Sequence, residues 1–330
     1  MKILVTGSTG FIGSHLCQAL VSAGENVRAF HRPSSSLEGL AGLAVERAIG
    51  DITRPDTLKP AMQDIEVVFH CAAMLGLPND PDQMYKVTVQ GTRNVMQAAR
   101  RAGVRRLVHT SSVAALGVPL ETQQAASPIP MDERHTWNFP PDRWRYGHAK
   151  YLAEMEVQFA VAQGLDAVIV NPAIVIGAGD LNRISGDTII HLAQGHIPVA
   201  VAAGLNAIHI EDVVRGHLAA LELGKTGERY ILGAENLTLL QFLQIIAQVA
   251  GVNAPKISLP ARLVRGLARP AQAAEKLLTL PVSSELLYKA GYFFYYDTRK
   301  AQKELGFCAR LSVRRSVAEA YAWYLGQGLV

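Results

Sequence analysis

The chain has 330 residues, of which 49% are apolar and 18% are charged, and this composition excludes a disordered or fibrous protein. The formal net charge is only +4, and the lysines and arginines are dispersed. The densest basic cluster, Arg100-Arg101 with Arg105-Arg106, flanks a predicted helix end, where cations complement the helix dipole. We therefore expect no nucleic-acid partner.

Targeting and redox signals are weak. Met1-Lys2 runs directly into a predicted strand without a signal-peptide pattern, and no apolar run reaches the roughly 18 residues that span a bilayer. Cys17, Cys71 and Cys308 lie far apart in apolar contexts, a spacing that predicts neither a metal site nor a disulfide framework. We expect a cytoplasmic protein with no membrane span.

The first half of the chain alternates short β-branched runs with longer helical patterns. The predicted strands are Lys2–Val5, Asn26–Phe30, Val45–Ile49, Val67–Cys71, Arg106–Thr110 and Ala167–Val170. The predicted helices are Ile12–Ala23, Thr57–Met62, Gln83–Ala102 and Arg145–Gln163. This alternation predicts βαβ units with right-handed crossovers, and hence an α/β fold with a doubly wound parallel Rossmann sheet.

The pattern changes near residue 171, so we expect a Rossmann domain over residues 1–171 and a smaller substrate lobe over 172–330, partly interleaved with it. Amphipathic helices are predicted at Leu239–Ala250 and Arg314–Tyr324. The segment Ile257–Leu280 is predicted to be helical and basic. Its apolar face either packs internally or forms a lid over a substrate pocket.

A glycine-rich loop, Thr6-Gly7-Ser8-Thr9-Gly10-Phe11-Ile12-Gly13, follows the first predicted strand and opens a helix. Gly7 permits a tight turn, Gly10 lets the backbone approach a pyrophosphate, and Gly13 allows close packing of helix and strand. The helix N-terminus offers free N–H groups to the phosphates. The loop predicts a dinucleotide site, and its expected contact residues are Gly7, Thr9, Gly10, Phe11 and Ile12.

The end of the second predicted strand indicates which dinucleotide is bound. It has no carboxylate for a ribose 2′-hydroxyl, but Arg32 and the serines that follow it suit a 2′-phosphate. We therefore expect NADP(H) to be favoured, with NAD(H) as the alternative. Asp51 and Ile52, just after the third predicted strand, are placed to border the adenine.

A phenol and an ammonium lie four residues apart in Tyr146-Gly147-His148-Ala149-Lys150, on one face of a predicted helix. A nearby cation favours the phenolate, so this spacing predicts a lowered pKa for Tyr146 and a role in proton transfer. Ser111-Ser112 end the fifth predicted strand, at the edge where doubly wound sheets bind their substrates. A hydroxyl there can bind a substrate carbonyl.

Together these motifs resemble the extended short-chain dehydrogenases/reductases of the NAD(P)-dependent epimerase/dehydratase superfamily, from Lys2 to Val330. The likeness is carried by Thr6–Gly13, Gly50–Ile52, His70–Ala73, Gly91–Val95, Thr110–Ser112, Tyr146–Lys150, Asn171–Ala173, Ile208–Val213 and Tyr296–Ala301. Val27–Arg32 and Thr110–Ser112 resemble dihydroflavonol-reductase-like members. Gly204–Asn206 and Gly227–Gly233 resemble a bacterial branch of hopanoid-associated sugar epimerases.

The resemblance implies roles for matching residues. Ser112 would bind the carbonyl, Tyr146 would be the general acid/base, and Lys150 would be its electrostatic partner and reach the nicotinamide ribose. The implied cofactor neighbours are Ala72, Ala73, Ser111, Pro172 and Val175. The resemblance also implies a homodimer through the helices near residues 83–102 and 145–163.

Two positions depart from the family pattern. Thr88 stands three residues before Gly91, where the family commonly has an asparagine. Leu205 stands four residues before His209, where nucleotide-sugar epimerases usually have an arginine that binds the diphosphate. A leucine cannot neutralise a diphosphate, so Leu205 weakens the sugar-nucleotide interpretation.

Three functions remain open. The leading one is an NADP(H)-dependent carbonyl reductase or alcohol dehydrogenase acting on a mostly apolar ketone or aldehyde. It is favoured by Arg32, by Leu205 and by loop residues such as Met74, Leu75, Leu77 and Trp144. The second is a nucleotide-sugar epimerase or dehydratase with tightly bound NAD(P). The third is a non-catalytic NADPH-binding regulator, which would not need an intact set of Ser112, Tyr146 and Lys150. The loops Met74–Asp82, Leu116–Pro141 and Gly177–Thr188 carry no motif that names the substrate.

Overall fold

The computed structural model describes residues 1–74, 80–120, 128–183, 186–275, 278 and 282–330. Its central sheet has seven strands in the order β10-β6-β5-β4-β1-β2-β3, all paired in parallel. The strands are β1 Lys2–Thr6, β2 Asn26–His31, β3 Glu46–Ile49, β4 Val67–His70, β5 Arg106–Thr110, β6 Ala167–Pro172 and β10 Arg229–Leu232. The predicted doubly wound α/β fold is confirmed.

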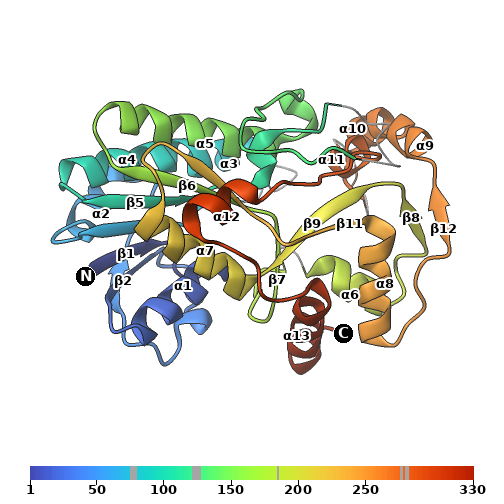
Figure 1. Cartoon of the computed structure of the whole chain (residues 1–330), viewed down its shortest axis with the longest axis horizontal. Coiled ribbons are helices and arrows are strands. Elements are labelled where there is room, and N and C mark those ends of the chain that lie inside the picture. The colour runs from blue at the N-terminus through green and yellow to red at the C-terminus, as the bar shows by residue number, and fades with distance from the viewer. Residues whose placement is uncertain (75–79, 121–127, 184–185, 276–277, 279–281) are drawn as a thin grey trace.

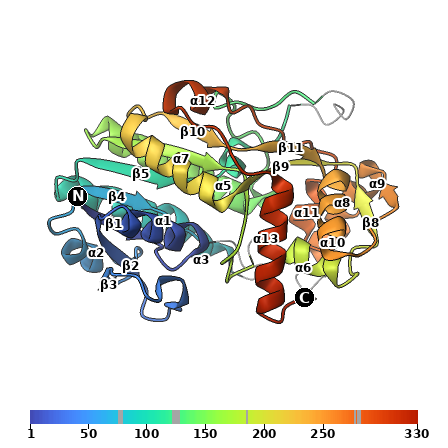
Figure 2. The ribbon, with the colours of Figure 1, turned by 60° about the horizontal axis from the view of Figure 1, so that its bottom comes forward.

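Helices cover both faces of this sheet because successive side chains of a strand point to opposite sides. Ile3 and Val5 belong to one buried apolar cluster, whereas Leu4 between them belongs to another. Helices α1 (Phe11–Ser22) and α7 (Ile210–Leu223) pack on the first side. Helices α2 (Pro55–Ala61), α4 (Gly91–Arg101) and α5 (Arg145–Ala162) pack on the second (Figures 1 and 2).

The sequence pattern predicts six strands of this sheet, and the structure adds β10 beside β6. This strand is only four residues long and comes from beyond residue 171. Its side chains Tyr230, Ile231 and Leu232 are fully buried, and α7 packs beside them. The last strand of the sheet therefore begins at Arg229, 57 residues after β6 ends at Pro172.

The single helix expected at Gln83–Ala102 is instead three consecutive pieces. These are α3 (Pro81–Tyr85), a π-helical turn (Lys86–Gln90) and α4. The hydroxyl of Thr92 donates to the carbonyl of Thr88 at 2.6 Å, and the hydroxyl of Thr88 bonds to the backbone of Met74. A π turn inserts one residue into the helical repeat, an irregularity that hydrophobic periodicity does not reveal.

The second lobe contains two small sheets. One has the order β11 (Glu235–Thr238), β9 (Gly204–His209) and β7 (Ile174–Ile176); the other pairs β12 (Ile257–Leu259) with β8 (Val199–Val201). Helices α6 (Asp187–Ala193), α8 (Leu239–Ala250) and α13 (Val313–Gly326) enclose a separate apolar core. The short helix α12 (Arg299–Leu305) instead packs near α7 and β10.

The expectation of a helical segment from Ile257 onward is wrong for its first residues. Residues 257–259 form β12, and Pro260 then precedes α9 (Ala261–Gly266), which is followed by α10 (Ala268–Ala274). Helix α11 (Ser284–Tyr288) completes this region. Proline at the helix start lacks the N–H that a strand ladder would use, which separates β12 from α9.

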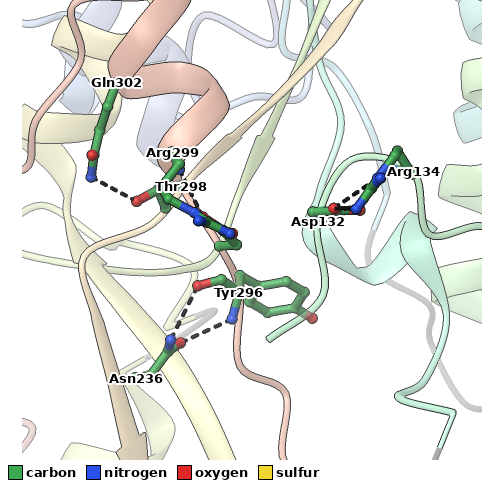
Figure 3. A network of polar contacts seen from close by, with 8 residues as sticks. Asp132, Arg134, Asn236, Tyr296, Thr298, Arg299 and Gln302 are labelled. Atoms are coloured by element: carbon green, nitrogen blue, oxygen red, sulfur yellow. Dashed lines mark hydrogen bonds and ion pairs between the residues drawn. The ribbon is translucent and has the colours of Figure 1, made fainter. Parts of the chain in front are cut away.

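Backbone pairing ties the loop after residue 128 to the segment before α12, and Figure 3 shows the hydrogen bonds of Asn236 to Tyr296 in that segment. Met131 bridges Tyr296, and the amide of Asp297 donates to the carbonyl of Met131 at 2.9 Å. The side chain of Asn236, on β11, accepts from the Tyr296 amide at 3.0 Å and donates to its carbonyl at 3.1 Å. These contacts join the loop between β5 and α5 to the segment before α12, and that segment to β11.

Within the described part of the chain, no helix is both long and apolar enough to cross a membrane. The same residues contain no group of three His, Cys, Asp or Glu side chains arranged to hold a metal ion. All three cysteines are free thiols.

Candidate active site

The glycine-rich loop has the geometry that its sequence predicts. Gly7 has a φ of +67°, and a Cβ there would lie 2.7 Å from the backbone nitrogen of Ala72. A Cβ on Gly13 would lie 2.1 Å from the carbonyl oxygen of Gly7. Both positions therefore require glycine: the first by its left-handed backbone and both by close approach of main chain.

Gly10 is the N-cap of α1, and no side chain caps this end of the helix. The first turn carries no acidic residue, so its positive dipole is not neutralised locally. A Cβ on Gly10 would meet only the Gly7 carbonyl, at 3.3 Å, so the outer side of the loop is open. Thr9 and Ile12 are half-buried and Phe11 is buried. An uncapped helix N-terminus beside open backbone suits an anionic phosphate.

The second and third strand ends lie beside this loop. Arg32, directly after β2, is exposed and forms no ion pair among the described residues. The carboxylate of Asp51 accepts from the amide and the hydroxyl of Thr53, each at 2.8 Å. The carbonyl of Ile52 accepts from Asn94 at 2.9 Å, and its side chain belongs to the same apolar cluster as Ala72. The structure thus places Ile52 near Ala72 and leaves Arg32 open to solvent.

Tyr146, Lys150 and Ser112 come together where β5 meets α5. Lys150 is buried, and its ammonium donates to the carbonyl of Thr110 at 2.8 Å. Ser112 caps a short 3-10 helix by accepting from the amide of Ala114 at 3.2 Å. Tyr146 is half-buried and interacts with the Ser112 hydroxyl. The YxxxK spacing and the strand-end serine are therefore neighbours.

The predicted lowering of the Tyr146 pKa is wrong for this structure. Burial raises the pKa of Tyr146, and the interaction with Ser112 offsets only part of that rise. The ammonium of Lys150 is directed to the Thr110 carbonyl, and burial lowers the pKa of Lys150 itself to about 8, against the opposing influence of Glu154. The helical spacing alone takes no account of the desolvation of both groups.

The remaining predicted neighbours divide into two groups. Pro172 ends β6 and Val175 lies on β7, and both are buried next to the sheet edge, with Val175 in the same cluster as Phe11. Ala72 is half-buried against Gly7, and Ala73 is exposed. Ser111 differs, because its hydroxyl donates to Glu154 at 2.5 Å and so faces the interior.

Sequence reasoning missed Glu154, which lies one turn beyond Lys150 on α5. It is buried and accepts from Ser111, from Asn171 at 2.6 Å, and from Arg229 at 3.1 Å. Asn171 also donates to the carbonyl of Ser112 at 2.9 Å. Glu154 thus links α5 to the ends of β5, β6 and β10. The spacing from Tyr146 through Lys150 to Glu154, every fourth residue, was the available signal.

Three buried histidines beneath the site were also missed. His70 bonds to Thr6 at 2.7 Å and to Thr92 at 3.0 Å, and its ring lies 5.2 Å from that of His109. His217 bonds to the Thr110 hydroxyl at 2.8 Å. Burial lowers the pKa of His70 to about 3 and of His217 to about 4, and it lowers the pKa of His109 well below its usual value. These rings are neutral at physiological pH.

Tyr146 borders an apolar cluster that is rich in aromatic side chains. Tyr146 packs against a cluster that joins Trp144 to Tyr288 of α11 and Ala268 of α10. The other members are Ala114, Val118, Trp137, Phe139, Leu287, Tyr292 and Phe294. Met74 is half-buried, whereas Leu75 and Leu77, also expected near the pocket, lie outside the described residues. The side of the site contributed by the second lobe is mostly apolar.

Leu205, the second departure from the family pattern, lies on β9. It is opposite Leu237 of β11 and packs against the apolar core of the second lobe. Thr88, the first departure, is buried in the π-helical turn and bonds to the backbone of Met74. Leu205 brings no positive charge to this part of the lobe.

A cavity of about 570 Å³ lies on the other side of α5. It is lined by Glu154, Tyr151, Arg229 and Lys300 among others, but not by Ser112 or Tyr146. Two ion pairs lie in its lining: Arg229 with Glu154, and Lys300 with Glu228 at 2.6 Å. Glu133 also lines the cavity; its carboxylate accepts from the amide of Ile231 at 2.9 Å, and burial raises its pKa.

Comparison with known proteins identifies the family to which the chain belongs. The model of the NAD dependent epimerase/dehydratase family matches residues 3–233, and the chain belongs to that family. It is 35% identical to the "Sterol demethylase protein B" of Methylococcus capsulatus, covering 100% of both chains, and 36% identical to a "Putative dihydroflavonol 4-reductase" of Synechocystis, covering 99% of this chain and 95% of the other. The crystal structure of gox2253 is 37% identical, with a TM-score of 0.87 over 99% of both chains.

Proposed function

We propose that the protein is an NADP(H)-dependent oxidoreductase, a carbonyl reductase or alcohol dehydrogenase that acts on a mostly apolar ketone or aldehyde. The observation that carries the proposal is the environment of Tyr146, which adjoins Ser112 on one side and the aromatic cluster on the other. A carbonyl oxygen held by the two hydroxyls would leave the rest of its molecule against apolar rings. Relatives named for a sterol and for a dihydroflavonol support an apolar substrate.

The residues at the sheet edge fit a dinucleotide. The glycine loop and the uncapped N-terminus of α1 offer backbone N–H groups to a pyrophosphate, and Asp51 and Ile52 border the expected adenine position. Exposed Arg32 would bind the 2′-phosphate that distinguishes NADP(H), so we propose a preference for it over NAD(H). When bound, the cofactor supplies or accepts the hydride at the carbonyl carbon.

Each member of the triad then has a task. Tyr146 would donate its phenolic proton to the carbonyl oxygen as negative charge develops there, and the raised pKa keeps that proton in place at neutral pH. The hydroxyl of Ser112 would polarise the same oxygen. Lys150, positively charged below about pH 8, would favour the phenolate that forms. Protonation, polarisation and charge stabilisation would thus act on one oxygen.

The second candidate is a nucleotide-sugar epimerase or dehydratase. The family model carries that name, and Asn171 at the end of β6 favours it because its Oδ1 is buried without a hydrogen-bond partner among the described residues. The same triad would then begin an oxidation instead of completing a reduction. A non-catalytic NADPH-binding regulator would need the glycine loop but not the assembled Ser112, Tyr146 and Lys150.

We also propose a homodimer through α4 and α5. Met155 and Phe159 on α5 are 40% and 61% exposed, which is unusual for large apolar side chains on a regular helix. An antiparallel pairing of these helices with a second copy would bury them. Residence in the reducing cytoplasm is part of the same proposal, supported by the three free thiols.

A substrate panel tests the function. The purified protein is mixed with NADPH or NADH and with cyclic and aromatic ketones and aldehydes, and cofactor absorbance is followed. We expect NADPH to be consumed faster than NADH with at least one apolar carbonyl compound. Turnover of a UDP- or dTDP-sugar without net cofactor consumption would favour the second candidate instead.

A further inference from the structure

Apolar side chains are exposed along one outer face of the second lobe. On β12, α9, α11 and the described residues between these elements, seven large apolar side chains are at least 36% exposed. They are Ile257, Leu259, Leu263, Leu267, Leu278, Val282 and Leu286. Isolated exposed leucines are ordinary, but a set gathered within 30 residues of one another marks an interaction surface.

Helical spacing places the two most regular members on one side. Leu263 and Leu267 are four residues apart and are 68% and 61% exposed, whereas Val264 and Ala268, each one position later, are buried. The buried pair faces inward, and Ala268 packs in the cluster that contains Trp144 and Tyr146. Because Val264 and Ala268 already supply the buried face of α9 and α10, the outward leucines are not needed for packing within the molecule.

Among the described residues of 256–286, the exposed charged side chains are all positive. Lys256, Arg262 and Arg269 are exposed, and Arg262 and Arg269 are seven residues apart, on the same side of the helical segment. The acids nearby are turned inward: Glu275 accepts from Ser284 at 2.6 Å, and Glu285 accepts from the amide of Arg145 at 3.2 Å. Asp142, an exposed acid, adjoins this region: its backbone carbonyl accepts from the side chain of Gln272 on α10.

We propose that this basic apolar face, formed by the described residues of 256–286 (256–275, 278 and 282–286), binds the surface of an anionic lipid bilayer. Leucine and isoleucine side chains would enter the boundary between headgroups and acyl chains, and Lys256, Arg262 and Arg269 would bind lipid phosphates, as in monotopic amphipathic helices. The face lies at the end of the molecule opposite the N-terminal strands, where α9 projects in both views (Figures 1 and 2). It is therefore free to meet a planar surface.

The position of this face also bears on the substrate, and here the inference rests on the proposed function. Helices α10 and α11 carry basic apolar residues outward and contribute Ala268 and Tyr288 inward to the cluster around Tyr146. An apolar ketone partitions into bilayers. Docking through 256–286 would bring the apolar side of the active site next to the phase that holds such a substrate.

Vesicle flotation tests the proposal with the full chain. Vesicles are made either of phosphatidylcholine alone or of phosphatidylcholine with 30 mol% phosphatidylglycerol, a fraction of roughly the order at which anionic surfaces attract polybasic segments. We expect the protein to float with the anionic vesicles and much less with the neutral ones, and to be released as salt is raised. The double variant Leu263→Ser/Leu267→Ser should lose most of the binding, and Arg262→Ala/Arg269→Ala should weaken it by about tenfold.

Matched controls share the chemistry but not the location. Leu223, 57% exposed at the end of α7, and the exposed pair Arg100-Arg101 at the end of α4 provide Leu223→Ser and Arg100→Ala/Arg101→Ala, which should bind like the parent protein. Equal flotation of all variants, or none for the parent protein, would overturn the proposal. So would a loss of self-association in Leu263→Ser/Leu267→Ser, measured by light scattering, because the face would then belong to a second copy.

Turnover of a water-soluble ketone without vesicles separates the two proposals. If the function is right, the variants at residues 262–269 should keep the parent rate, because they leave the triad intact. If no ketone is turned over but anionic vesicles still bind, the proposed function fails while the docking surface stands. If turnover is normal but vesicles do not bind, the reverse holds.

Discussion

Most polar side chains at the carboxyl edge of β4, β5 and β6 are buried and hydrogen-bonded, whereas apolar side chains on the outer face of residues 256–286 are exposed. At the first region, Glu154 alone accepts from three side chains, and Lys150 is held by a backbone carbonyl. At the second, Leu263 and Leu267 are more than 60% exposed. Both regions reverse the usual distribution of polar and apolar residues.

This difference between the two regions suits two different tasks, the reaction itself and the recruitment of the substrate. Burying charged groups is costly unless they are paired, so the first region is retained for what its polar groups do to a reacting atom. Exposing leucines costs solubility, so the second is retained for what it contacts. Under the proposed function, the polar edge would protonate the carbonyl oxygen, and the apolar lobe would select which carbonyl compounds reach it.

Removing the phenol should have the largest effect. Tyr146→Phe leaves the ring and its aromatic neighbours but deletes the proton donor, so we expect kcat to fall by about 10³-fold with little change in NADPH affinity. Steady-state kinetics and fluorescence titration measure the two. Tyr151→Phe, on the same helix, is the control and should keep its activity. A near-normal kcat for Tyr146→Phe would show that Tyr146 is not the proton donor.

Substitution of Arg32 tests whether the end of β2 determines the preference for NADPH over NADH. Arg32→Ala should weaken NADPH binding by about 10- to 100-fold, since a charge-assisted hydrogen bond is worth about 1.5–3 kcal/mol, and should leave NADH binding unchanged. Isothermal titration with both cofactors measures the ratio. Arg54→Ala removes an exposed arginine that pairs with Asp56 instead, and serves as control. Unaltered NADPH/NADH selectivity in Arg32→Ala would refute the assignment.

Glu154 is a positioning residue, and its removal should have a smaller and more selective effect. Glu154→Gln keeps the shape but weakens the bonds from Ser111 and Arg229, so we expect kcat to fall by about tenfold while KM for the ketone and affinity for NADPH hold. Glu156→Gln, two residues along, breaks only the surface pair with Arg93 and is the control. A change confined to thermal stability, with kcat intact in the folded enzyme, would make Glu154 purely structural.

The buried histidines should make the polar edge acid-sensitive. Their folded pKa values lie below that of an exposed histidine, so as pH falls from 7 toward 5 the unfolded chain takes up protons that the folded chain cannot, and stability falls. We expect a loss of about 1–2 kcal/mol per histidine over that range, measured by urea unfolding.

His109 offers the sharpest variant, because both of its ring nitrogens are buried without a partner among the described residues. His109→Phe should therefore reduce the loss of unfolding free energy between pH 7 and pH 5 by the contribution of one histidine. His196→Gln, at an exposed position, should leave it unaltered. An equal slope in all three proteins would show that other groups govern acid stability.

The features that could be predicted from the sequence are local, and those that could not be predicted join segments distant in the chain. Alternating strands and helices predicted the sheet because each βαβ unit is local, and Gly7 and Gly13 were identifiable because backbone contacts demand glycine. The pKa of Tyr146 was mistaken because desolvation depends on the aromatic cluster, whose members come from residues 114 to 294. Strand β10 and the links of Glu154 to Arg229 and Asn171 were missed because they join segments distant in sequence.

The proposed assignment of Tyr146, Ser112 and Arg32 to hydride reduction has one most direct test. The enzyme is mixed with NADPH carrying deuterium at both C4 positions and with an apolar ketone from the panel, and the products are analysed by mass spectrometry. We predict that the alcohol carries one deuterium on its carbinol carbon and that NADP⁺ is released in equal amount. An unlabelled ketone, with epimerisation of a nucleotide sugar and no net release of oxidised cofactor, would contradict the assignment.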